Sequence, residues 1–140
     1  RNHPGYQEFM RGVIDYAVKE VKADLLHFDN FINETGWGPT AIEDFRGYLR
    51  AKYNPAELDQ YFGGSDLKDV GRLAWEGYSP VIQEWQLFRH WSLAEAYRKL
   101  TEYARSLNPE VAINANTGGI SMSGYPGMVD ILLPVFRLIL

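Results

Sequence analysis

The feature that most constrains this chain is a short apolar run, LLHF at positions 25–28, between two helical patterns. An apolar run of this length predicts a buried strand, here Asp24–Phe28. Four polar residues follow it closely: Asp29, Asn30, Asn33 and Glu34. Polar side chains just past a buried strand lie where parallel α/β folds place their chemistry. Asp29 and Asn30 also suit a simple chain turn, but four such residues after one strand favour a functional site.

Composition narrows the class of protein. The chain has 140 residues, 46% hydrophobic and 23% charged, which is typical of one globular domain spanning residues 1–140. A net charge of −4 without a basic stripe argues against a nucleic-acid partner. Without cysteine there is no disulfide or thiolate metal site, and no run is as long as a membrane span. We therefore expect a soluble protein, cytoplasmic or secreted, with no cofactor, metal or membrane partner.

Apolar residues at helical spacing predict two long helices, Gly5–Lys22 and Ser79–Leu107. The second has a typical start, because the capping hydroxyl of Ser79 precedes a proline at the first helical position. His3, just before the first helix, is interpreted as a surface or capping residue.

Two shorter helices are predicted to begin at Pro39 and Pro55. The apolar stripe of the first is Ile42, Phe45, Leu49 and Tyr53. Gly63-Gly64-Ser65 is expected to end the second. The stretch Asp66–Gly77 has weak periodicity, and we expect an irregular loop there that carries Trp75.

Two more strands are predicted, at Val111–Asn114 and Val129–Leu133. The first of these ends in amides, Asn114 and Asn116. Short apolar strands among helices predict an α/β fold with a parallel sheet covered by helices, and polar strand ends are typical of a (β/α)8 TIM-type barrel. A whole barrel needs about 250 residues, so we expect one partial barrel domain. Its unpaired strand edges and the apolar stretch Ile131–Leu140 predict that the isolated 140 residues self-associate, for example as a homo-oligomer, or need the missing segments of the barrel.

Four segments resemble, in order and spacing, the middle of a glycoside hydrolase barrel. They are Asn33-Glu34-Thr35-Gly36, AIEDFRGYLRAKY at 41–53, WQLFRHWSLAEA at 85–96, and SLNPEV at 106–111 followed by Asn114-Ala115-Asn116. Together they are similar to the family 42 β-galactosidases and their uncharacterised glycosyl hydrolase relatives, over about Tyr6 to Asn116. The resemblance implies a hydrolase that cleaves O-glycosyl bonds of a carbohydrate substrate.

The resemblance also implies residue roles. Glu34 matches the general acid/base of the family, and Asn33 matches an amide that contacts a sugar hydroxyl. Glu34 lies several residues past the apolar run, however, whereas Asp29 occupies the strand end, so both remain candidates for the acid. The family's nucleophile comes from a later strand, beyond Leu140. Its cysteine-bearing metal segment is absent, and Gly36–Thr40 stands in its place.

Substrate contacts are expected near the strand ends. The candidates are Asn30, Asn33, Trp37, Asn114 and Asn116. A glycosidase needs two carboxylates, about 5–5.5 Å apart for retention or 6.5–9.5 Å apart for inversion. The acid needs a pKa above its ordinary value, which burial against Phe28, Phe31 or Trp37 would supply.

Three functions stay open. The first is a glycoside hydrolase of which this chain is the middle portion. The second is a non-catalytic carbohydrate-binding or structural relative that keeps the barrel but lacks one carboxylate. The third is an interaction module that docks through the helix Ser79–Leu107, which predicts an apolar patch along that helix.

Overall fold

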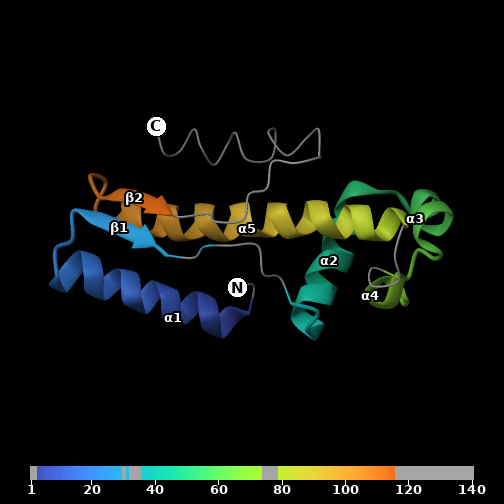
Figure 1. Cartoon of the computed structure of the whole chain (residues 1–140), viewed down its shortest axis with the longest axis horizontal. Helices are drawn as coiled ribbons and strands as arrows, with labels where there is room; N and C mark the ends of the chain where they lie inside the picture. Colours follow the sequence, from blue (N-terminus) through green and yellow to red (C-terminus); the bar gives the residue numbers. More distant parts are fainter. Residues whose placement is uncertain (1–2, 30, 32–35, 74–78, 116–140) are drawn as a thin grey trace. The chain divides into compact units, whose positions relative to one another are not determined.

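The computed structural model describes residues 3–29, 31, 36–73 and 79–115. Its elements follow in order: α1 (Pro4–Asp15), the π-helix η1 (Tyr16–Glu20), β1 (Leu25–Phe28), α2 (Pro39–Lys52), α3 (Pro55–Phe62), α4 (Val70–Leu73), α5 (Pro80–Leu107) and β2 (Ala112–Ala115) (Figure 1). The chain divides into two compact units. Unit 1 comprises Arg1–Glu34 and His90–Leu140, and unit 2 comprises Thr35–Arg89. Each unit has its own buried apolar cluster.

In unit 1, α1 and η1 together form the predicted first helix. His3 caps it, because its Nδ1 accepts a hydrogen bond from the Gly5 amide at 3.1 Å, which confirms the capping interpretation. The last turn widens into η1, and Lys22 then adopts a positive φ of 57°. The Ala23 amide donates to the Ala17 carbonyl at 3.0 Å, which closes the helix end and sends the chain directly into β1.

The two described strands pair in parallel, as predicted. Leu25 lies opposite Ala112 and Phe28 opposite Ala115, and the two arrows of Figure 1 point the same way. The predicted bounds are confirmed to within one residue at each end. The third predicted strand, Val129–Leu133, and the apolar stretch that follows it lie outside the described residues.

Alternation along the strands separates the two faces of this sheet. One face carries Leu26, Phe28, Ile113 and Ala115, which belong to or pack against the apolar cluster of unit 1. Residues from α1, η1 and α5 complete that cluster: Ile14, Val18, Leu93, Ala96, Tyr97, Leu100 and Ala104. The opposite face carries Leu25, His27, Ala112 and Asn114, all exposed. Two strands with helices on one face are compatible with several α/β folds, so the barrel stays a prediction.

In unit 2, the predicted stripe of α2 packs largely as expected. Phe45 and Leu49 are fully buried with Trp85 and Phe88 of α5, whereas Ile42 and Tyr53 are partly buried at the edge of the cluster. The helix α3 begins with a capping box, in which Asn54 and Glu57 exchange hydrogen bonds of 3.0 and 2.8 Å. Gly63 ends it at a φ of 79°, which confirms the predicted break.

The prediction of an irregular loop at Asp66–Gly77 is partly wrong, because α4 (Val70–Leu73) lies within it. Leu67 and Val70 are fully buried, and this anchoring orders a stretch that lacks obvious periodicity. Trp75, which the same prediction placed in the loop, lies outside the described residues.

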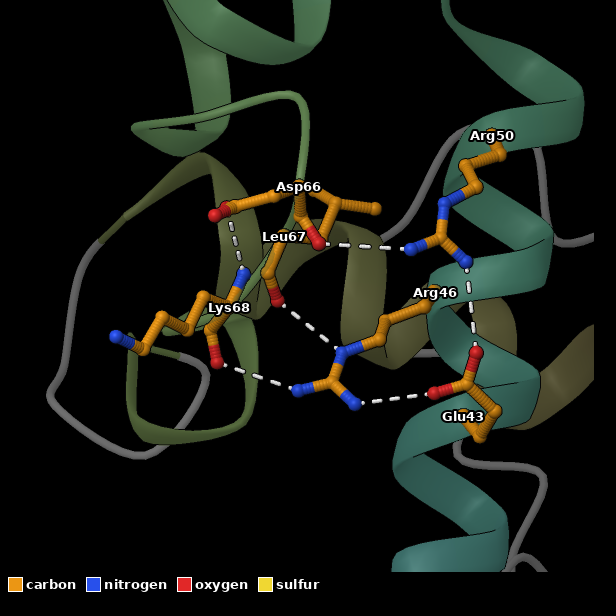
Figure 2. Close-up of polar contacts among 6 residues, drawn as sticks. All are labelled: Glu43, Arg46, Arg50, Asp66, Leu67 and Lys68. Carbon is orange, nitrogen blue, oxygen red and sulfur yellow. Dashed lines mark hydrogen bonds and ion pairs between the residues drawn. The ribbon is translucent and has the colours of Figure 1, made fainter.

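Two arginines of α2 hold the segment before α4 in place (Figure 2). Arg46 donates to the carbonyls of Leu67 at 3.1 Å and Lys68 at 3.2 Å, and Arg50 donates to the Asp66 carbonyl at 3.4 Å. Glu43 accepts from both guanidinium groups, at 3.0 and 3.4 Å. The segment therefore satisfies its backbone carbonyls with side chains of α2.

The exposed apolar side chains of unit 1 give the predicted self-association a testable location. Phe9, Val13 and Tyr16 share one face of α1–η1 and are 65%, 46% and 66% exposed. Replacing Phe9 and Tyr16 together by Lys should shift the 140-residue chain toward monomer in sedimentation velocity at micromolar concentration, because this stripe would no longer bury apolar surface.

Glu8→Lys is the matched control, since it adds the same net charge on the exposed part of α1 without touching the stripe. A wild-type chain that sediments as a sharp monomer would contradict the prediction. So would equal effects of the control and the double variant.

Candidate functional site

The carboxyl ends of β1 and β2 form the candidate site. Because the strands are parallel and in register, their carboxyl ends meet at one edge of the sheet. Asp29 follows β1 directly at this edge and is exposed. Asn114 is the third residue of β2 and lies on the sheet face that no described helix covers. Asp29 and Asn114 therefore lie at the same end of the β1–β2 sheet in unit 1.

His27 joins this site, although the sequence analysis counted it only as part of an apolar run. It lies directly opposite Asn114, and its Nδ1 is 2.6 Å from the Asn114 Oδ1. Both side chains are exposed. The available signal was strand alternation, which places His27 on the opposite face from Leu26 and Phe28.

The burial expected for an acid at Asp29 is not found, because Asp29 is exposed. Phe28 and Phe31, the proposed apolar neighbours, are buried instead in the core of unit 1. Their rings lie 5.9 and 5.6 Å from that of Tyr97 and 5.7 Å from each other. Four predicted site residues lie outside the described residues: Asn30, Asn33, Glu34 and Asn116.

Trp37 belongs to unit 2 and has a buried partner. Its ring stacks on that of Trp85 at 4.2 Å with an interplanar angle of 15°, and it remains 38% exposed. Since Trp85 covers one ring face, that face of Trp37 cannot stack on a sugar. The substrate-binding role of Trp37 stays a prediction.

Unit 2 also contains a buried carboxylate that the sequence analysis missed. Glu84 of α5 is only 8% exposed. Lys52 donates to its two oxygens at 2.9 and 2.8 Å, and the hydroxyls of Tyr48 and Tyr53 donate to it at 3.2 and 2.9 Å. The Lys52 ammonium also lies over the rings of Tyr48 and Tyr53, at 5.6 and 5.3 Å.

The charges of this cluster perturb one another. Burial alone would lower the pKa of Lys52, but the hydrogen bonds and charge of Glu84 outweigh burial and raise it well above its ordinary value. Burial, and then the neighbouring Glu84 carboxylate, raise the pKa of Tyr48 and of Tyr53. With Lys52 and two hydroxyls donating to it, Glu84 acts as a structural ion that ties α2 to α5 within unit 2.

This cluster predicts a loss of stability at alkaline pH. Lys52, Tyr48 and Tyr53 all have raised pKa values in the folded state, so the unfolded chain releases these protons first. Their stabilising contribution is complete below the unfolded pKa values and falls as pH rises above about 10. Urea midpoints followed by tryptophan fluorescence should therefore decrease between about pH 9 and 11.

Lys52→Met should lower the midpoint at neutral pH, because it leaves Glu84 without its cation, and should flatten the alkaline decrease. Lys99→Met, at an exposed position of α5, is the control and should leave the decrease unchanged. An equally steep alkaline decrease in the Lys52 variant would contradict this account.

The described residues show neither a metal site of the usual kind nor a membrane-spanning helix. Among residues 3–29, 31, 36–73 and 79–115, no group of three or more His, Cys, Asp or Glu side chains is placed to hold a metal ion. Within the same ranges, no helix is long and apolar enough to cross a membrane.

Comparison with known proteins gives two distant relatives, both named α-agarase. The protein of Thalassotalea agarivorans is 25% identical over an alignment of 152 positions, which covers 89% of this chain and 10% of the relative. The protein of Alteromonas agarilytica is 26% identical over an alignment of the same length, which covers 89% of this chain and 11% of the relative. The chain thus spans about a tenth of the length of these curated relatives. No family model and no solved structure matches it.

The comparison confirms the coarser part of the expected relationship. The chain is distantly related to glycoside hydrolases, since an α-agarase is such an enzyme. The expected assignment to family 42 is not supported, because the relatives found are α-agarases rather than β-galactosidases.

Proposed function

We propose that this chain contributes part of the active site of a glycoside hydrolase acting on an agar-type polysaccharide. The observation that carries the proposal is the in-register parallel pairing of β1 and β2, which brings their polar carboxyl ends to one sheet edge. The distant similarity to α-agarases over 89% of the chain supports the reaction class and suggests the substrate.

The fold proposed for the whole enzyme is a (β/α)8 barrel. In unit 1 the helices cover one face of the β1–β2 sheet, and the other face carries the polar pair His27 and Asn114. A barrel has this same division, with helices outside and the remaining strand face directed inward. Active sites of such barrels lie at the carboxyl ends of the strands, where Asp29 is found.

The proposed chemistry uses a carboxyl group that protonates the departing glycosidic oxygen. Glu34 is the favoured acid because it carries the Asn-Glu resemblance and because a glutamate side chain is longer than that of an aspartate. Asp29 then orients the substrate or its neighbours. The second carboxylate that glycosidases require comes from another part of the enzyme. Asn30, Asn33 and Asn116 are proposed to contact sugar hydroxyls.

A docking role for α5 receives no support from the structure. All residues of α5 are described, and Trp91, 41% exposed, is the one large apolar side chain of this helix that is exposed. The predicted apolar patch along this helix is therefore not present, and the interaction module is the weaker candidate.

The proposal predicts unequal effects of two substitutions in the protein that carries this chain. Glu34→Gln should lower turnover of agarose by about 10²–10⁴-fold, the usual contribution of general acid catalysis. It should cost much less on an activated aryl glycoside, whose leaving group needs little protonation. Asp29→Asn should instead weaken substrate affinity or stability. Reducing-sugar release and aryl-group absorbance measure the two rates.

Asp24→Asn is the matched control, because Asp24 is an exposed carboxylate at the opposite, amino end of β1. It should leave both rates unchanged. If Asp29→Asn abolishes turnover while Glu34→Gln is silent, the roles of the two residues are reversed. If neither substitution changes turnover in an active enzyme, this segment is not catalytic. If the wild-type protein binds agarose without cleaving it, the protein is the non-catalytic relative.

A further inference from the structure

The open face of the β1–β2 sheet carries a polar pair that the fold does not require. His27 and Asn114 are directly opposite each other, and both are exposed. Asn is disfavoured in strands, where β-branched and aromatic residues pack better. Their neighbours on the same face, Leu25 and Ala112, are apolar and also exposed, so the pair is the polar part of this face.

The contact within the pair favours one placement of the imidazole proton. The Asn114 Oδ1 is an acceptor only, and it lies 2.6 Å from the His27 Nδ1. This contact is a hydrogen bond when the His27 Nδ1 carries the proton. In the neutral ring the other nitrogen, Nε2, then holds a lone pair and is an acceptor.

The position of the pair connects it with the candidate site. His27 is the second-last residue of β1, and Asp29 follows the strand at the same end. Asn114 is likewise the second-last residue of β2. The His27 imidazole, which contacts Asn114 of the neighbouring strand β2, thus lies beside the carboxyl edge of the sheet, where the proposed active site is.

We propose that His27 is a sugar-binding residue whose imidazole is fixed by Asn114 so that Nε2 accepts a hydrogen bond from a substrate hydroxyl. Asn114 is then a positioning residue that acts through His27. The inference rests on the proposed function, since it names a group that binds the same carbohydrate substrate. Sugar hydroxyls are donors as well as acceptors, and a fixed acceptor selects the orientation of the hydroxyl that it meets.

Kinetics of the protein that carries this chain, with agarose as substrate, test the roles of both residues. His27→Ala should raise KM by about three- to tenfold, the value of one hydrogen bond, with little change in kcat. Asn114→Leu should also raise KM. Because Asn114 acts through His27, the double variant should be no worse than His27→Ala alone.

Ala112→Ser, on the same exposed face, is the control and should leave KM unchanged. His27→Gln guards against misfolding, since it keeps a polar side chain of similar reach, and it should also raise KM while circular dichroism stays native. Additive effects of His27→Ala and Asn114→Leu, or a KM unchanged in every His27 variant, would overturn the inference.

A second measurement separates failure of this inference from failure of the proposed function. In the protein that carries this chain, ¹⁵N-histidine labelling gives a spectrum in which His27→Gln identifies the signals of His27. His27 should show the Nδ1–H tautomer, Asn114→Leu should lose that preference, and an agarose hexasaccharide should shift the Nε2 signal. A shift without any hydrolysis would retain the binding role and reject the hydrolase. An Nε2–H tautomer, or no shift at saturating hexasaccharide in an active enzyme, would reject the binding role.

Discussion

The parallel pairing of β1 with β2 is the contact on which unit 1 depends. It joins positions 25–28 to positions 112–115, and the Ala112 amide extends the ladder by donating to the Asp24 carbonyl at 2.9 Å. Pairing in this register puts Phe28 and Ile113 into one core with the helices, and it sends His27 and Asn114 to the other face. A shift of one residue in either strand would exchange those faces and expose the core.

Helix positions were largely predictable from the sequence, because local signals specify them. Pro39, Pro55 and Pro80 each lie at the start of a helix, and Gly63 ends α3 with the positive φ that glycine tolerates. The strands were predictable because each is a short apolar run. The helix α4 was missed because the order of its stretch comes from the burial of Leu67 and Val70 and from bonds that Arg46 donates to the preceding segment. Arg46 lies 21 and 22 residues away from its two acceptors in the sequence.

The site was less predictable, because its geometry depends on contacts between distant residues. Glu84 lies on the buried face of α5, between Val81 and Trp85. A carboxylate at such a position requires a cation or hydrogen-bond donors nearby, because burying an unpaired charge is costly. Its partners come from α2, and spacing along the chain does not identify them. The pairing of His27 with Asn114 likewise follows only from the strand register.

The family resemblance was carried in part by residues 41–53 and 85–96. These two segments supply several members of the unit 2 core and of the Glu84 cluster. Much of the resemblance therefore reflects packing.

Both proposals require that carbohydrate binds at the carboxyl edge of the β1–β2 sheet. A crystal structure of the protein that carries this chain, with an agarose hexasaccharide bound, tests it most directly. We expect a sugar hydroxyl within hydrogen-bonding distance of the His27 Nε2, with the sugar chain continuing past Asp29. A hexasaccharide bound at the amino end of β1, beside Asp24, or remote from both strands would contradict it.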